Sequence, residues 1–372
     1  MRTTPFLCLV GLLLCGAAQA VTELRPGRGD EVIEQLPAIT RVRLAQTAMA
    51  DPAAAAAQAR AFIATARQTG DTRYWGRAQA ALAPWWGQAE APVALAVLQA
   101  TVQQGRHEFQ AARSVLQAAL QRDPGHAQGW LNLAALERLS GRYPQALRAC
   151  EAVARAGQNF YAQACQLETQ SLQGQTGAAR KGLVALRAQT QDTGQRSWLD
   201  SLLAESEERA GHDAAALAAY QSSLQQEPDL YTSIALADLL LRTGKAADAL
   251  AVLQPLPQTD AVLLRQAAAM RRLGNPAWKP LRSTLREWNG ELARRGDDLG
   301  LHGREQALVA LWLDDDAPAA LAIARRNLGL QREPIDWWVA LQSARQAKDS
   351  SALQQLQTEM QATGLVDARS SP

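Results

Sequence analysis

The feature of this 372-residue sequence that most restricts its fold is a pair of short amphipathic segments joined by a glycine turn. The clearest copy covers residues 123–156. Apolar side chains recur at helical spacing over 130–136, Ser140-Gly141-Arg142 breaks the pattern, and a second helical face starts at Tyr143. One such hairpin cannot bury its apolar face alone, so the pattern predicts neighbours that stack against it.

The same arrangement recurs along the sequence. Clear copies occupy residues 93–121, 198–225 and 230–253, a degenerate copy occupies 160–186, and the period returns at 301–328 and 338–362. Helices are also expected at 38–49, 52–68 and 74–83, and helices with a poorer match to the repeat at 263–273 and 276–295. Most apolar residues are Ala and Leu, aromatic residues make up 5%, and no stretch alternates as a strand does. The sequence therefore predicts an all-α chain of about nine hairpins.

The spacing within the clearest copy resembles the tetratricopeptide repeat (TPR), a helical hairpin of about 34 residues. Trp130 precedes Leu133 by three residues, and the turn glycine Gly141 precedes the small Ala146 by five. The resemblance is specific for four or five units and covers most of the chain. It implies a TPR-like α-solenoid, a right-handed superhelix whose concave groove is lined by the first helix of each unit. The whole sequence resembles exported TPR proteins of Gram-negative bacteria.

The pattern divides the chain into four parts. Residues 1–20 are predicted to be a cleaved signal peptide and 21–37 a charged lead-in. Residues 38–364 form the predicted repeat array, and 365–372 form a tail that we expect to fray. The weakly repeating region near 255–300 is either a bend between two repeat blocks or a continuous part of the array.

The N-terminus has the parts of a secretory signal: a positive Arg2, an apolar run over 6–15, and a small-x-small site at Ala18-Gln19-Ala20. The run is shorter than the roughly 20 residues that span a bilayer. The sequence therefore predicts export to a bacterial periplasm and a mature chain that does not span the membrane. Lipidation of Cys15 is the alternative, although Leu14 stands where a lipobox has a small residue, and an uncleaved anchor is another.

Removal of the signal peptide leaves two cysteines, Cys150 and Cys165. They fall on the second helix of one hairpin and the first helix of the next, which are neighbours in a stacked array. In an oxidising compartment they could form a disulfide. Two buried thiols that pack as small hydrophobic side chains are the equal alternative.

The sequence shows no arrangement typical of catalysis, cofactor binding or metal binding. The histidines at 107, 126, 212 and 302 are isolated, and phosphate-loop, nucleophile-elbow and zinc-protease motifs are missing. Asp314-Asp315-Asp316 lacks calcium-loop spacing and fits a helix-capping turn. A net charge of +2 does not favour nucleic acid. We therefore expect a protein that is not an enzyme.

The tryptophans have two predicted roles. Trp130 and Trp338 occupy the position where the repeat buries an aromatic side chain, so both are expected in the core. Trp85-Trp86 and Trp337-Trp338 are adjacent pairs, and adjacent residues on a helix face different sides. One member of each pair is therefore expected at an interface or between hairpins.

The resemblance assigns the groove to the inward faces of three first helices. These residues are Gln128, Leu131, Asn132 and Arg138, then Trp198, Ser201 and Glu205, then Tyr231, Ile234 and Asp238. Some TPR domains hold a peptide carboxylate with a Lys/Asn/Arg clamp, but Leu131, Ser201 and Ile234 stand at its lysine positions. The mixed aromatic, aliphatic and acidic surface favours an extended peptide or a docked helix, and a solvated face without a ligand is the alternative.

The predicted function is a periplasmic scaffold or adaptor that binds a peptide or an envelope protein in its concave groove, without a cofactor. A structural subunit that contacts partners through its convex face or its ends is the alternative. An enzyme would need an embedded domain, and the region from 255 to 300 is too short for one. Binding of a small ligand or polysaccharide would need more groove aromatics than Trp198 and Tyr231.

Overall fold

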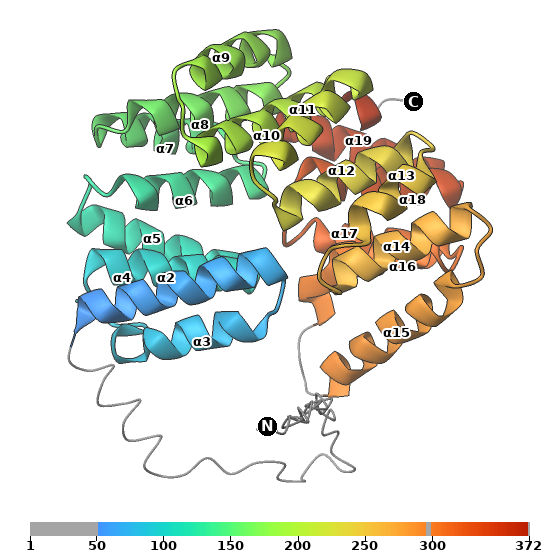
Figure 1. Cartoon of the computed structure of the whole chain (residues 1–372), viewed down its shortest axis with the longest axis horizontal. Coiled ribbons are helices and arrows are strands. Elements are labelled where there is room, and N and C mark those ends of the chain that lie inside the picture. The colour runs from blue at the N-terminus through green and yellow to red at the C-terminus, as the bar shows by residue number, and fades with distance from the viewer. Residues whose placement is uncertain (1–50, 295–298, 371–372) are drawn as a thin grey trace, which may run out of the picture. The chain divides into compact units, whose positions relative to one another are not determined.

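The computed structural model describes residues 51–294 and 299–370 (Figure 1). These residues belong to one compact unit, Ala48–Pro372. The predicted signal peptide, the lead-in and the expected helix at 38–49 lie outside the described residues.

The described residues form eighteen α-helices and three short 3-10 helices, and they contain no strand. The first nine are α2 (Pro52–Thr69), α3 (Arg73–Ala81), α4 (Val93–Gly105), α5 (Phe109–Arg122), α6 (Ala127–Leu139), α7 (Tyr143–Arg155), α8 (Asn159–Leu172), α9 (Thr176–Ala188) and α10 (Thr193–Arg209). The next nine are α11 (Asp213–Gln226), α12 (Leu230–Arg242), α13 (Ala246–Leu253), α14 (Asp260–Arg272), α15 (Trp278–Arg294), α16 (Gly303–Trp312), α17 (Ala317–Asn327), α18 (Pro334–Gln346) and α19 (Ser350–Thr363). The 3-10 helices are η1 (Ala83–Trp85), η2 (Leu299–His302) and η3 (Ala368–Ser370).

Each even-numbered helix packs against the odd-numbered helix that follows it, which gives nine successive hairpins from α2–α3 to α18–α19. Left-handed glycines make several of the turns, as at Gly141 (φ 69°) and Gly211 (φ 79°). Asp315 takes the same conformation in the acidic turn (φ 55°), and the Asp316 side chain caps α17 by accepting from Ala319 N–H at 3.0 Å. These hairpins confirm the predicted all-α, TPR-like solenoid.

Among the described helices, none is both long enough and apolar enough to cross a bilayer.

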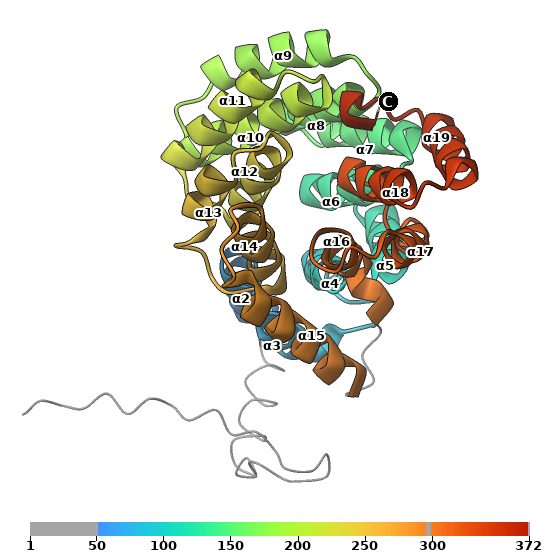
Figure 2. The ribbon, with the colours of Figure 1, turned by 90° about the vertical axis from the view of Figure 1, so that its right-hand side faces the viewer.

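The array curves until its last hairpins meet its early ones. Figure 2 shows the first helices of successive hairpins, from α6 to α18, arranged as a ring. The Arg332 N–H, just before α18, donates to the Leu139 carbonyl at the end of α6 at 2.7 Å. Nδ1 of His107, in the α4–α5 turn, lies 2.5 Å from the Leu301 carbonyl oxygen in η2. The described helices therefore form a closed ring. In an open solenoid, by contrast, the first and last hairpins do not meet.

The segment after α19 completes this closure. The Val366 N–H donates to the Leu172 carbonyl at the end of α8 at 2.9 Å. The Arg369 guanidinium lies 3.0 Å from the Glu208 carboxylate on α10, and Leu365 and Ser370 are buried. The prediction that the tail frays is therefore wrong for residues 365–370.

The aromatic core differs in part from the prediction. Trp337 is the tryptophan of its pair that is fully buried, whereas Trp338 is half-buried and packs edge-on against Trp312. Trp130 is also half-buried, and its indole N–H donates to the Pro124 carbonyl at 2.9 Å. The repeat spacing identifies the helix face but not which of two adjacent tryptophans the neighbouring hairpin covers.

Candidate functional site

The ring of first helices encloses a cavity of about 770 Å³, which we call the central cavity. One wall comes from α6, α8, α10, α12 and α14. The opposite wall comes from the start of α16, the start of α18 and η3, because ring closure brings these elements across from α10 and α12. The concave surface of the described residues is therefore walled on both sides.

Seven of the ten predicted groove residues line the central cavity. They are Arg138, Trp198, Ser201, Glu205, Tyr231, Ile234 and Asp238. The other three lie at the start of α6, outside the lining. There the Gln128 amide donates to Asn132, and Asn132 donates to Thr101 on α4 at 3.0 Å. The Leu131 side chain packs against a small core cluster around Cys150 and Cys165.

The opposite wall was not foreseen from the sequence. Its lining residues are Arg304, Glu305, Glu333, Pro334, Ile335 and Arg369. In the sequence, the charged residues among them occur at positions like those of ordinary solvent-exposed helix residues. Only ring closure places them at a site, and no local pattern encodes that closure.

Carboxylates hold the guanidinium groups of the central cavity. The N–O distances are 2.8 Å for Arg138–Glu168, 2.7 Å for Arg265–Asp238, 2.7 Å for Arg304–Asp336, 3.0 Å for Arg369–Glu208 and 3.6 Å for Arg209–Glu205. Arg265 engages Asp238 through two nitrogen atoms, and Arg304 also pairs with Glu333. These bidentate contacts join α12 to α14 on one wall and α16 to α18 on the other, so they hold neighbouring helices of each wall together.

Glu205 and Tyr231 form a hydrogen-bonded polar pair that lines the central cavity. The Tyr231 hydroxyl donates to Glu205 at 2.8 Å, and 59% of the Tyr231 surface is exposed because the ring lies along the cavity. Burial raises the pKa of Glu205, and the nearby Arg209 only partly opposes this effect. The negative charge of the Glu205 carboxylate raises the pKa of Tyr231. A carboxylate held at a cost inside a cavity is typical of a functional site.

Replacement of Glu205 by glutamine is expected to raise the free energy of unfolding at pH 7 and to leave it unchanged near about pH 4. The folded-state pKa of Glu205 is raised, so this group contributes stability below the unfolded-state pKa and loses that contribution as the pH rises through the folded-state pKa. Glutamine resembles the neutral carboxyl at every pH. Urea unfolding at both pH values measures the difference, and a less stable variant at pH 7 would contradict the expectation.

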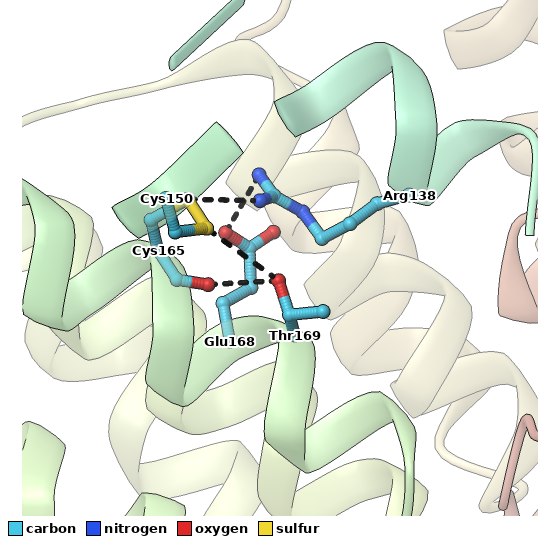
Figure 3. Close-up of a disulfide and its surroundings, with 5 residues drawn as sticks. All are labelled: Arg138, Cys150, Cys165, Glu168 and Thr169. Carbon is cyan, nitrogen blue, oxygen red and sulfur yellow. Dashed lines mark hydrogen bonds and ion pairs between the residues drawn. A yellow bond between two sulfur atoms is a disulfide. The ribbon is translucent and has the colours of Figure 1, made fainter. Parts of the chain in front are cut away.

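A disulfide supports one corner of the central cavity (Figure 3). Cys150 on α7 and Cys165 on α8 are joined, with Cα atoms 5.6 Å apart. The Arg138 guanidinium lies 3.5 Å from the Cys165 sulfur and also pairs with Glu168, one turn further along α8. The bridge thus fixes the helix that presents Glu168 to Arg138.

Within the described ranges, no group of three or more His, Cys, Asp or Glu side chains is arranged to hold a metal ion. The acidic turn is neutralised by arginines, because Asp314 pairs with Arg282 and Arg286 and Asp315 pairs with Arg271. His107 and His302 meet at the ring closure, with their ring centroids 6.1 Å apart. Their distance in sequence gives no sign of this contact.

Comparison with known proteins gives one family match. Residues 103–171, from the end of α4 to α8, match the tetratricopeptide repeat model. No curated protein matches the chain at a significant level.

The chain is also similar to several solved structures. Pseudomonas aeruginosa PilF is 18% identical with a TM-score of 0.37, covering 55% of this chain and 92% of that one. A Rap protein complexed with competence and sporulation factor is 9% identical with a TM-score of 0.49, covering 87% and 92%. A human IFIT1 dimer with PPP-AAAA is 11% identical with a TM-score of 0.40, covering 78% and 69%. We infer nothing about function from likenesses at these scores.

The family match coincides with the hairpins whose spacing carries the resemblance. It includes the α6–α7 hairpin, with Trp130, Leu133, Gly141 and Ala146 at the positions that the repeat requires. The hairpins on both sides continue the same stacking. Residues 103–171 therefore match the tetratricopeptide repeat family, and the neighbouring hairpins share the fold of this segment.

Proposed function

We propose that this protein is a scaffold that binds a short segment of an envelope protein in the central cavity. The fold is that of a protein–protein interaction scaffold, and the exposed Tyr231 ring inside the cavity is the observation that carries the proposal. A volume of about 770 Å³ falls within the range of pockets that enclose small ligands. It favours a few residues of extended chain over a helix of several turns.

The exposed apolar side chains favour the central cavity over the convex face. Among the described residues, the large hydrophobic side chains that are exposed are Val184, Tyr231, Leu273 and Val366. They come from different hairpins, and single exposed side chains of this kind are normal on any surface. Tyr231 is the one that lines the cavity, where an aromatic side chain can anchor a partner.

Loss of partner binding is expected when the cavity lining is changed. A pull-down from detergent-solubilised envelope compares the wild type with a variant that carries Trp198→Ala, Glu205→Lys and Tyr231→Ala. The matched control carries Val184→Ala, Glu151→Lys and Leu273→Ala, all at exposed positions outside the lining. Circular dichroism verifies the fold of both variants.

We expect the cavity variant to lose a partner that the wild type and the control retain. A partner lost only by the control would instead assign binding to the convex face and support the structural-subunit function.

We also propose that the protein acts in the periplasm. The support is the signal-like sequence at 1–20, which lies outside the described residues, and the Cys150–Cys165 disulfide, a bond that persists in oxidising compartments. Fusion of residues 1–40 to alkaline phosphatase is expected to give an active, exported reporter of cleaved size. Cytoplasmic retention would contradict export, and a Cys15→Ala change that alters processing would indicate lipidation.

A further inference from the structure

The central cavity carries a surplus of negative charge. Its lining contains five arginines, no lysine and no histidine. It contains eight carboxylates, at Glu168, Glu205, Glu208, Glu227, Asp229, Asp238, Glu305 and Glu333. The net charge of the lining is thus opposite in sign to the +2 of the whole chain.

The surplus is concentrated in carboxylates that form no ion pair with an arginine or only a long one. The five arginines are already engaged by the carboxylates described above. The Glu305 carboxylate, on the α16 wall, makes no hydrogen bond or ion pair to any residue that the structure describes, and neither does the carboxylate of Glu227, which is exposed beside α12. The only cation that pairs with Glu205 among the described residues is Arg209, at 3.6 Å. Negative charge therefore faces the cavity from both walls.

Aromatic faces accompany these carboxylates. Tyr231 and Trp198 line the same cavity, and the Tyr231 hydroxyl is occupied by its bond to Glu205. The exposed part of Tyr231 therefore offers its ring rather than a free hydroxyl. A guanidinium or ammonium group is attracted both by an aromatic face and by a carboxylate.

The tail supplies an independent example of this recognition within the molecule. Residues 365–370 lie across the ends of α8 and α10, where the Val366 N–H donates to the free Leu172 carbonyl. The same segment delivers the Arg369 guanidinium to Glu208, a carboxylate of the cavity lining, at 3.0 Å. One edge of the cavity thus already holds a stretch of chain by a main-chain hydrogen bond and an arginine.

We propose that the central cavity selects a peptide segment that presents an arginine or lysine side chain. Glu205 is its charge partner, Tyr231 is the aromatic surface against which the side chain lies, and Glu305 adds charge from the opposite wall. This inference rests on the proposed function, because it specifies the class of segment that the cavity binds.

The test is selection from a phage-displayed library of short random peptides on the immobilised full chain. A parallel selection on a Trp198→Ala/Tyr231→Ala variant, verified as folded, identifies the peptides whose binding depends on the cavity. Synthetic forms of these peptides, with each arginine or lysine also replaced by neutral citrulline or glutamine, are then measured by calorimetry. Spermidine is measured alongside as a cation without a peptide backbone.

We expect cavity-dependent peptides to share a basic residue, whose neutral replacement weakens binding about tenfold or more. Glu205→Gln and Glu305→Gln should each weaken binding of the basic peptide, whereas Glu151→Gln, an exposed change on α7, should not. Cavity-dependent peptides without a basic residue would overturn the inference and leave the proposed function standing. Binding of spermidine without any cavity-dependent peptide would overturn both in favour of a small cation, and no cavity-dependent binding at all would overturn both outright.

Discussion

Replacement of Arg304 by methionine is expected to lower the free energy of unfolding by about 3–5 kcal/mol at pH 7. Arg304 on α16 contacts the buried Asp336 through two nitrogen atoms, at 2.7 and 2.9 Å, and also pairs with Glu333. Asp336 further accepts from Asn327 and from the Glu333 N–H, so it joins α16, α17 and the start of α18. Methionine fills similar space but leaves a buried carboxylate without its cation.

The loss of unfolding free energy in the Arg304→Met variant is expected to be smaller at lower pH. Burial raises the pKa of Asp336 to about 6 even though Arg304 lowers it, so loss of Arg304 should raise this pKa further. A carboxyl with a raised folded-state pKa contributes stability below its unfolded-state pKa and loses it as the pH rises through the folded-state pKa. The variant should therefore recover part of its stability between pH 7 and about pH 5.

Urea unfolding at the two pH values, followed by circular dichroism, measures this prediction. Arg326→Met is the matched control, because Arg326 is an exposed arginine on the neighbouring α17. The control should change stability by less than about 0.5 kcal/mol. An Arg304 variant with equal deficits at pH 7 and pH 5 would show that lost packing, rather than the unpaired carboxylate, causes the destabilisation.

Reduction of the Cys150–Cys165 disulfide is expected to lower the free energy of unfolding by about 3 kcal/mol. The two cysteines are 15 residues apart, and the bond limits the conformations of that loop in the unfolded chain. Both cysteines are buried, so after reduction their thiols gain no contact with solvent that would offset the lost stability. Urea unfolding of the same protein with and without reductant isolates the cross-link from any change of side chain.

A Cys150→Ala/Cys165→Ala variant is the control for this measurement and should not respond to reductant. Thiol titration of the unfolded wild type before reduction should find neither Cys150 nor Cys165 free. Two reactive thiols that map to these positions would instead mean that the cysteines pack as a buried, unbonded pair.

The hairpins could be predicted because their determinants are local. Helical spacing, turn glycines such as Gly141 and the acidic turn at Asp316 lie within a few residues of the elements that they specify. The resemblance to the repeat family assigned Trp198, Glu205 and Tyr231 to the inward faces of first helices, and the structure brings these three to the central cavity. The adjacency of consecutive hairpins also predicted that Cys150 and Cys165 are neighbours, but it did not decide between a disulfide and two buried thiols.

The second wall of the cavity could not be predicted, because its position depends on curvature summed over many hairpins. Arg304 and Glu305 look like ordinary solvated helix residues until α16 is brought across from α10. The tail has the same property, since Arg369 meets Glu208 only after the chain has turned through the whole ring. Gln128, Leu131 and Asn132 were assigned to the groove by the family pattern, but in the structure they lie outside the cavity lining, where Asn132 bonds to Thr101 on α4 and Leu131 packs against the cluster around Cys150 and Cys165.

The closed ring restricts how such a protein can evolve. In an open array, duplication or loss of one hairpin alters only the length, because each unit contacts its immediate neighbours. Here Arg332 must arrive beside Leu139, and Val366 beside Leu172, so one additional unit would carry both past their partners. Ring closure thereby fixes the number of hairpins. Variation that keeps the ring closed is confined to substitutions and to changes in loops on its outer rim.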